Sequence, residues 1–202
     1  MVSLDKRRQH ERNKYLALYG RKEGMHVITK DKDGQPQPLS AYAKCNASRL
    51  QVRWLTQVLD RWKLPIKSAV DFGCGRNGWC VALRERGIAA TGVDFACPLA
   101  DVDAPMHYTG LPSESADIVT AWDALEHCLP DDVPLVLAEM RRVVKHGGLF
   151  LAHIPTGASR VEVDGENLHA TQRPIAWWRD RLREAGFKGI REKENDFWGR
   201  AG

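Results

Sequence analysis

Hydrophobic and polar positions follow two alternating periods from about residue 66 onward, and this alternation predicts strands followed by helices. Short apolar runs bounded by turn residues predict strands, because a strand buried on both faces reads as a continuous apolar segment. The expected strands are Ser68–Phe72, Ala90–Asp94, Met106–Thr109, Asp117–Trp122, Leu149–Ile154 and Phe187–Glu192. Apolar residues at helical spacing predict helices over Gly78–Arg86, Asp131–Lys145 and Pro174–Ala185.

A further helix is expected upstream, starting at Ser48 and ending before Pro65. Its apolar face carries Leu55, Val58, Leu59 and Trp62. Repeated strand–helix alternation predicts an α/β fold, with a doubly wound, mostly parallel sheet and helices on both faces. The segment Asn195–Arg200 either forms a closing antiparallel strand or leaves the last strand incomplete.

Charge divides the chain into two parts. Residues 1–33 hold nine Lys/Arg and five Asp/Glu, which gives +4, the whole net charge of the protein. Turn residues over 31–38 end this part, so we predict a basic N-terminal segment, 1–40, and a second domain, 41–202. The segment is either a solvated tail or a lid that attracts an anionic substrate or nucleic acid.

Composition sets the class of protein. A chain of 202 residues is long enough for one well-buried domain. No apolar run reaches the roughly 20 residues of a membrane helix, and the N-terminus lacks the apolar region of a secretory signal. Five cysteines without a C-x-x-C pair suit a reduced compartment, so we expect a cytoplasmic protein without a membrane partner.

A glycine loop follows the first predicted strand of the alternating region. Gly73, Gly75 and Gly78 form G-x-G-x-x-G, which is typical of loops that approach a nucleotide. Asp71 separates two ligand classes, because a carboxylate repels a pyrophosphate and attracts an ammonium group. S-adenosylmethionine carries an ammonium, a sulfonium and a ribose. Asp71 and Asp94, which ends the next strand, suit that cofactor.

The sequence resembles the class I S-adenosylmethionine-dependent methyltransferases over about residues 66 to 192. The motifs that carry the resemblance are D-F-G-C-G from Asp71, L-P at Leu111, A-D-I-V at Ala116, W-D-A-L-E-H at Trp122, the run from Ala138 to Gly148, and E-A-G-F at Glu184. The resemblance implies a Rossmann-like sheet and S-adenosylmethionine as the cofactor. A departure is Asn77, which stands where the family usually has glycine.

The resemblance also implies roles for single residues. The residues expected around the cofactor are Asp71, Gly73, Cys74, Gly75, Asp94, Phe95, Trp122 and Asp123. Asp94 would bind the ribose hydroxyls, and Phe95 would lie against the adenine. His127 is the expected general base, with His169 and His153 as further residues that could face the acceptor.

Three interpretations of the function remain open at this point. The first is methyl transfer to an oxygen of a small molecule, with no metal. The second is an RNA-directed 2′-O-methyltransferase with a divalent metal at Asp123, Glu126, His127 and His169, similar to the metal site of small-RNA 3′-terminal methyltransferases. The third is a domain that binds a cofactor or a partner without catalysis. The acceptor, the oligomeric state and the methylated atom are left open by the sequence.

Overall fold

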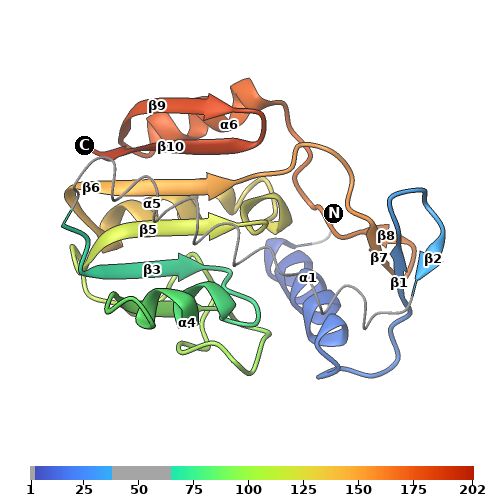
Figure 1. The fold of residues 1–202 in the computed structure, drawn as a ribbon. Helices are drawn as coiled ribbons and strands as arrows, with labels where there is room; N and C mark the ends of the chain where they lie inside the picture. The colour runs from blue at the N-terminus through green and yellow to red at the C-terminus, as the bar shows by residue number, and fades with distance from the viewer. Residues whose placement is uncertain (1–2, 38–64) are drawn as a thin grey trace.

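The computed structural model describes residues 3–37 and 65–202, and a six-stranded sheet forms its centre (Figure 1). Its strand order is β4-β3-β5-β6-β10-β9. The strands are β3 Ser68–Phe72, β4 Ala89–Val93, β5 Ala116–Trp122, β6 Val144–His153, β9 Phe187–Lys193 and β10 Asp196–Ala201. Neighbours among β4, β3, β5 and β6 pair in parallel, and β10 runs antiparallel to β6 and β9. The prediction of a doubly wound, mostly parallel α/β fold is confirmed.

Helices cover both faces of this sheet, as Figure 1 shows. Helix α4, Gly78–Arg84, packs on one face, and α5, Val133–Val143, and α6, Ile175–Glu184, pack on the other. Successive side chains of strand β3 point to opposite faces of the sheet. Val70 belongs to the core under α5, and Ala69 belongs to the core under α4. Each large apolar side chain buried in these cores contributes about 1.5–3 kcal/mol.

The predicted strand Met106–Thr109 is wrong, because Met106 and His107 lie in a turn and the two residues after them have no regular secondary structure. The connection from β4 to β5 contains no helix either. Val102 already pairs beside Val93 in an isolated parallel bridge, and Pro105 provides no N–H for a further ladder. This connection therefore covers the edge of β4 without adding a strand.

The last strand is complete, so the possibility of a truncated sheet is not realised. Strand β10 pairs with β6 from Asp196 to Arg200 and with β9 from Asp196 to Ala201. It corresponds to the alternative that placed a closing antiparallel strand over Asn195–Arg200.

A second, four-stranded sheet was not predicted. Its order is β2-β1-β7-β8, with β1 Val27–Lys30, β2 Pro36–Gln37, β7 Val161–Val163 and β8 Glu166–Asn167. Strand β1 pairs antiparallel with β7, so the N-terminal segment is joined to the insertion between β6 and α6. Helix α1, Leu4–Leu18, lies beside the carboxyl ends of the central strands, between the two sheets (Figure 1).

The predicted helix that starts at Ser48 and ends before Pro65 lies outside the described residues. Among the helices that are described, none has the length and apolar character needed to cross a membrane.

Candidate functional site

The glycine loop turns sharply after β3. Gly73, Gly75 and Asn77 all have positive φ, at 73°, 51° and 60°. Asparagine is among the few residues other than glycine that tolerate this conformation, which explains how Asn77 serves at a position where the family usually has glycine. A Cβ on Gly73 would lie 2.6 Å from the Cβ of Ala124, so this position requires glycine for packing as well as for φ.

Asp94 holds the loop and the end of β4 together. Its Oδ2 accepts a hydrogen bond from the amide of Gly75 at 3.1 Å, and its Oδ1 accepts from the amides of Ala96 and Cys97 at 2.8 and 2.9 Å. These bonds fix the carboxylate at the carboxyl edge of the sheet, where ligands of doubly wound folds bind.

Gly92 is a site residue that sequence reasoning missed. A Cβ at this position would lie 2.2 Å from Oδ1 of Asn77 and 2.7 Å from Sγ of Cys74. The glycine loop therefore packs directly on the backbone of β4. The amide of Gly92 donates to Asp101 at 2.7 Å, and Asp101 also accepts from the side chain of Asn77 at 3.0 Å.

Asp71 lies beneath the loop, buried at 3 % exposure. The hydroxyl of Thr120 donates to its Oδ1 at 2.6 Å. Burial raises the pKa of Asp71 to about 7, although the Thr120 hydrogen bond lowers it. Asp71 is thus packed under the proposed methionine site, and its role toward an ammonium group stays a prediction.

A cavity of about 310 Å³ opens at the carboxyl edge of the central sheet. The predicted site residues that line it are Gly73, Asp94, Phe95, Asp123 and His127. Those that do not line it are Asp71, Cys74, Gly75, Trp122 and His169. Trp122 instead packs toward Trp79, with ring centroids 6.1 Å apart. Burial raises the pKa of the Cys74 thiol, which agrees with a packing role.

Helix α1 forms the opposite wall of the cavity. Its Tyr15 contacts Phe95 and His127 edge to face, with ring centroids 5.8 and 5.5 Å apart. The guanidinium of Arg12 lies over the Phe95 ring, 5.8 Å from its centre. The helix therefore touches both the side chain expected at the adenine and the expected base.

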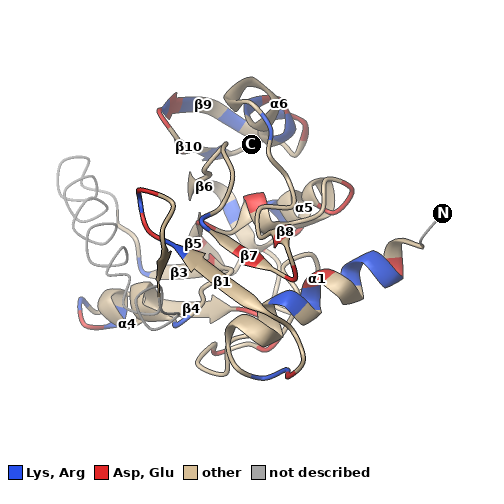
Figure 2. Cartoon of the chain, turned by 90° about the vertical axis from the view of Figure 1, so that its right-hand side faces the viewer, with Lys and Arg blue, Asp and Glu red and all other residues tan. Residues whose placement is uncertain are grey.

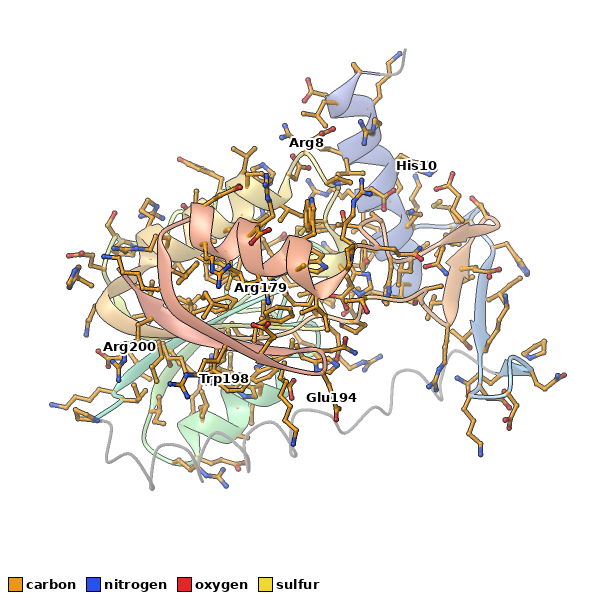
Figure 3. The ribbon with its side chains drawn as sticks, turned by 90° about the horizontal axis from the view of Figure 1, so that it is seen from above. Arg8, His10, Arg179, Glu194, Trp198 and Arg200 are labelled. Carbon is orange, nitrogen blue, oxygen red and sulfur yellow. The ribbon has the colours of Figure 1, made fainter. Side chains whose placement is uncertain are left out.

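Ion pairs hold α1 against the rest of the molecule. Arg8 binds Asp132, the residue before α5, with Nε 2.9 Å from Oδ1, and Arg7 lies 3.1 Å from Asp131. Figure 3 labels Arg8 on α1, on the side toward α5. Figure 2 shows the positions of Lys and Arg along this helix in blue, with acidic positions in red between them. The basic charge of the N-terminal segment is thus partly neutralised within the molecule.

A buried cluster of Glu126, His127 and His169 lies next to the cavity. Glu126 and His127 come from the short 3₁₀ helix Leu125–His127 after β5, and His169 follows β8. Nε2 of His127 is 3.7 Å from Oε1 of Glu126, and Nε2 of His169 is 3.9 Å from the same oxygen. The fold thus brings together three of the four residues of the expected metal set. The carboxylate of Asp123 lies outside this cluster.

The hydrogen bonds of the two histidines fix their tautomers. Nδ1 of His127 is 3.1 Å from the carbonyl of Leu168, and Nδ1 of His169 is 2.6 Å from the carbonyl of Gly157. A carbonyl only accepts, so both Nδ1 atoms carry the proton and both Nε2 atoms present a lone pair. Burial lowers the pKa of His127 to about 3 and also lowers that of His169.

Glu126 is fully buried, and within the described part of the chain neither carboxylate oxygen has a hydrogen-bond partner. Burial raises the pKa of Glu126 well above its ordinary value. Two imidazole lone pairs and one carboxylate, with both rings oriented by backbone carbonyls, form a donor set that suits a divalent cation.

Comparison with known proteins assigns the family. The family model described as "Methyltransferase domain" matches residues 42–192, about three quarters of the chain. The chain is a class I S-adenosylmethionine-dependent methyltransferase. The predicted family, enzyme class and cofactor are therefore confirmed.

Curated relatives of this methyltransferase include two O-methyltransferases. A malonyl-[acyl-carrier protein] O-methyltransferase of Serratia marcescens is 32% identical over 120 residues, which cover 50% of this chain and 46% of the relative. A ubiquinone biosynthesis O-methyltransferase of Pseudomonas aeruginosa is 29% identical over 141 residues, covering 61% and 56%. The methyltransferase thus spans about half the length of the curated relatives it matches.

Solved structures share the fold of this methyltransferase. A Burkholderia thailandensis 1,6-didemethyltoxoflavin-N1-methyltransferase, solved with bound 1,6-didemethyltoxoflavin and S-adenosylhomocysteine, has a TM-score of 0.64 at 16% identity. The match covers 100% of this chain and 91% of that one. A SAM-dependent methyltransferase of Archaeoglobus fulgidus has a TM-score of 0.53 at 18% identity, covering 69% and 71%.

Proposed function

We propose that this methyltransferase transfers the methyl group of S-adenosylmethionine to an oxygen of a small molecule. The observation that carries the proposal is the cavity, because one space is lined by Asp94 and Phe95, by Asp123 and His127, and by α1. The names of the curated relatives, both O-methyltransferases, support oxygen as the methylated atom.

The proposed roles of the cofactor residues follow from their places at the cavity. Asp94 would accept hydrogen bonds from the ribose hydroxyls, and Phe95 would pack on the adenine. Gly73 leaves room for the methionine end, with Asp71 buried beneath it. We further propose that α1 acts as a lid, since its Tyr15 and Arg12 contact Phe95.

His127 is proposed as an active-site residue that orients the acceptor. Its Nδ1–H is held by Leu168, so the Nε2 lone pair is available to accept a hydrogen bond from a hydroxyl. Methyl transfer from a sulfonium is an in-line displacement, and an enzyme accelerates it mainly by positioning the two partners and excluding water. His169 would support the ring of His127, whose centroid lies 4.8 Å away.

The proposal is tested by methyl transfer from S-adenosylmethionine labelled in the methyl group. The acceptor panel is catechol, 4-nitrocatechol, benzoate and aniline, and NMR identifies the methylated atom. We expect methylation of oxygen, and a kcat lower by about 100-fold for His127→Ala with unchanged affinity for S-adenosylhomocysteine. The matched control is His146→Ala, since His146 is exposed and does not line the cavity. Transfer to nitrogen alone, or to no acceptor, would contradict the proposal.

A second candidate function is metal-assisted methyl transfer, including transfer to the 2′-hydroxyl of RNA. The unpartnered carboxylate of Glu126 between two oriented imidazoles favours it. Glu126, His127 and His169 would hold the cation, and a bound cation would lower the pKa of an acceptor hydroxyl. The pairing of Arg7 and Arg8 with acids leaves fewer cations for phosphates, so the small-molecule acceptor stays the first proposal.

Calorimetric titration with Mn²⁺, Zn²⁺ and Mg²⁺ tests this candidate. We expect binding by the unmodified protein and loss of binding in Glu126→Gln, which keeps the shape but removes the charge. Glu184→Gln is the control, because Glu184 is exposed on α6. Absence of any binding heat, together with activity that is insensitive to a chelator, would contradict a metal site. For RNA, a steep fall of affinity with salt is the expected signature.

A further inference from the structure

Three polar side chains stand in a row along the carboxyl edge of the central sheet. Strand pairing places Trp122 opposite His153 and His153 opposite Asp196, so that the ends of β5 and β6 and the start of β10 lie side by side (Figure 1). Asp123 follows Trp122 directly. The sheet register therefore sets the order Asp123, His153, Asp196 across three neighbouring strands.

His153 is oriented by Asp196. Its Nδ1 lies 2.7 Å from Oδ1 of Asp196, and a carboxylate can only accept, so Nδ1 carries the proton. Nε2 therefore presents its lone pair, and it faces Oδ1 of Asp123 at 3.7 Å. A carboxylate that orients an imidazole in this way also stabilises the imidazolium when the ring takes up a proton.

Asp123 connects this row with the cavity, which its side chain lines. Its φ is 49°, a left-handed conformation that costs free energy for residues other than glycine and that clusters at functional sites. The amide of Asp123 donates to the carbonyl of His153 at 3.1 Å, which holds this turn against β6.

We propose that Asp123 accepts the hydroxyl proton of the acceptor during methyl transfer and passes it through His153, oriented by Asp196, to solvent. This inference rests on the proposed oxygen methylation of a hydroxyl. It makes Asp123 the general base, and it makes His153 and Asp196 positioning residues that act through Asp123.

The atoms of the step balance. The acceptor oxygen forms a bond to the methyl carbon while the carbon–sulfur bond breaks and its electron pair remains on sulfur as the thioether. The acceptor proton moves to Asp123, then to Nε2 of His153. The imidazolium, hydrogen-bonded to Asp196, releases it to water. His153 is about one third exposed and Asp196 about half exposed, so this end of the row is open to solvent.

The gap between Asp123 and His153 is compatible with such a transfer. At 3.7 Å it is only slightly longer than a hydrogen bond, and the Asp123 side chain, 48% exposed, has room to rotate toward the ring. His127 is less suited to carry the proton away, because its Nε2 faces the buried Glu126 rather than solvent.

The test compares methylation of catechol with that of 4-nitrocatechol, whose hydroxyl is already ionised near neutral pH and needs no base. On catechol, Asp123→Asn is expected to lower kcat by about 100-fold, and His153→Gln and Asp196→Asn by roughly 10-fold. On 4-nitrocatechol all three variants are expected within about threefold of the unmodified protein, and the His153 and Asp196 variants keep its affinity for S-adenosylhomocysteine. Glu194→Gln, an exposed residue in the β9–β10 turn labelled in Figure 3, is the matched control.

Three results would overturn the relay. If the unmodified protein methylates hydroxyls and the variants keep their rates on catechol, the relay is wrong and the proposed function stands. If the variants lose equal activity on both catechols, the residues serve the structure and not the proton. If the unmodified protein methylates only carboxylates or amines, the proposed hydroxyl acceptor fails, and the relay fails with it.

Discussion

At the scale of single residues, Asp71 links stability to pH. Its pKa in the folded protein is about 7, against an ordinary value of 3.8, so the folded state retains a proton that the unfolded chain releases between these pH values. The free energy of unfolding should therefore fall as pH rises through this window, by at most about 1.4 kcal/mol per pH unit from this group. Above about pH 7 the loss is complete.

Substitution by asparagine isolates this effect. Asp71→Asn keeps an acceptor for Thr120 and removes the titration, so its stability relative to the unmodified protein should increase from about pH 5 to about pH 8. His127, whose pKa is lowered to about 3 from an ordinary 6.5, makes the free energy of unfolding rise with pH between these values. Both proteins contain His127, so this contribution cancels in the difference between them. Urea unfolding of both proteins at each pH measures the difference. If the difference in stability between the two proteins does not change with pH, Asp71 does not have the raised pKa described here.

Gly92 offers a second prediction at this scale. In Gly92→Ala the new methyl group meets Asn77 and Cys74, so the glycine loop must shift. We expect a loss of about 2 kcal/mol in stability and weaker binding of S-adenosylhomocysteine. Gly157→Ala is the control, because no atom lies within 4 Å of a Cβ at that position, and it should change stability by less than about 0.5 kcal/mol. Equal effects of the two substitutions, followed by thermal unfolding, would argue against the packing of the loop on β4.

Residue roles that depend on neighbours in the chain could be predicted from the sequence, and roles that depend on distant contacts could not. The left-handed loop and the acid that closes β4 have local signatures, so Gly73, Gly75, Asn77 and Asp94 could be placed in advance. Gly92 could not, because its need for glycine comes from side chains 15 and 18 residues earlier in the chain. The pairing of His153 with Asp196 depended on the position of the closing strand, which the sequence left open.

At the scale of elements, α1 is held mainly by its contacts with the rest of the protein. It contains few apolar residues, and its buried residues are Lys14, Ala17 and Leu18. Arg8→Gln removes the charged hydrogen bonds to Asp132 and should raise amide hydrogen exchange in α1 by about tenfold, with little change in the central sheet. Lys6→Gln is the control, since the side chain of Lys6 is exposed and makes no ion pair in the described part of the chain. Unchanged exchange in Arg8→Gln would contradict the role of this ion pair.

Elements with strong local patterns were predicted well, and those formed by distant pairing were not. Helix α5 has buried apolar residues at positions 133, 136, 137, 140 and 143, a spacing that the sequence displays directly. Strands β1 and β7 have four and three residues and lie far apart in the chain, so neither carries a pattern that is distinct from a loop. Met106–Thr109 does not form the predicted strand, since Pro105 beside it provides no N–H for a ladder.

At the scale of the whole molecule, the second sheet connects the N-terminal segment with the candidate site. Strand β1 pairs with β7, Lys30 pairs with Glu162 at 2.5 Å, and His10 lies 2.9 Å from Glu166. The loop after β8 then supplies His169 to the cluster around Glu126. The N-terminal segment, which forms one wall of the cavity, is therefore joined to the β7–β8 region, which supplies His169. No local sequence motif indicates this connection.

The central claim is that the cavity at the carboxyl edge of the sheet binds S-adenosylmethionine through Asp94. Calorimetric titration with S-adenosylhomocysteine measures this most directly, on the unmodified protein and on Asp94→Ala. The account predicts saturable one-to-one binding and an affinity lower by at least about 10-fold in the variant, since a carboxylate hydrogen-bonded to the ribose is lost. No binding at millimolar concentration, or equal affinity of the two proteins, would contradict it.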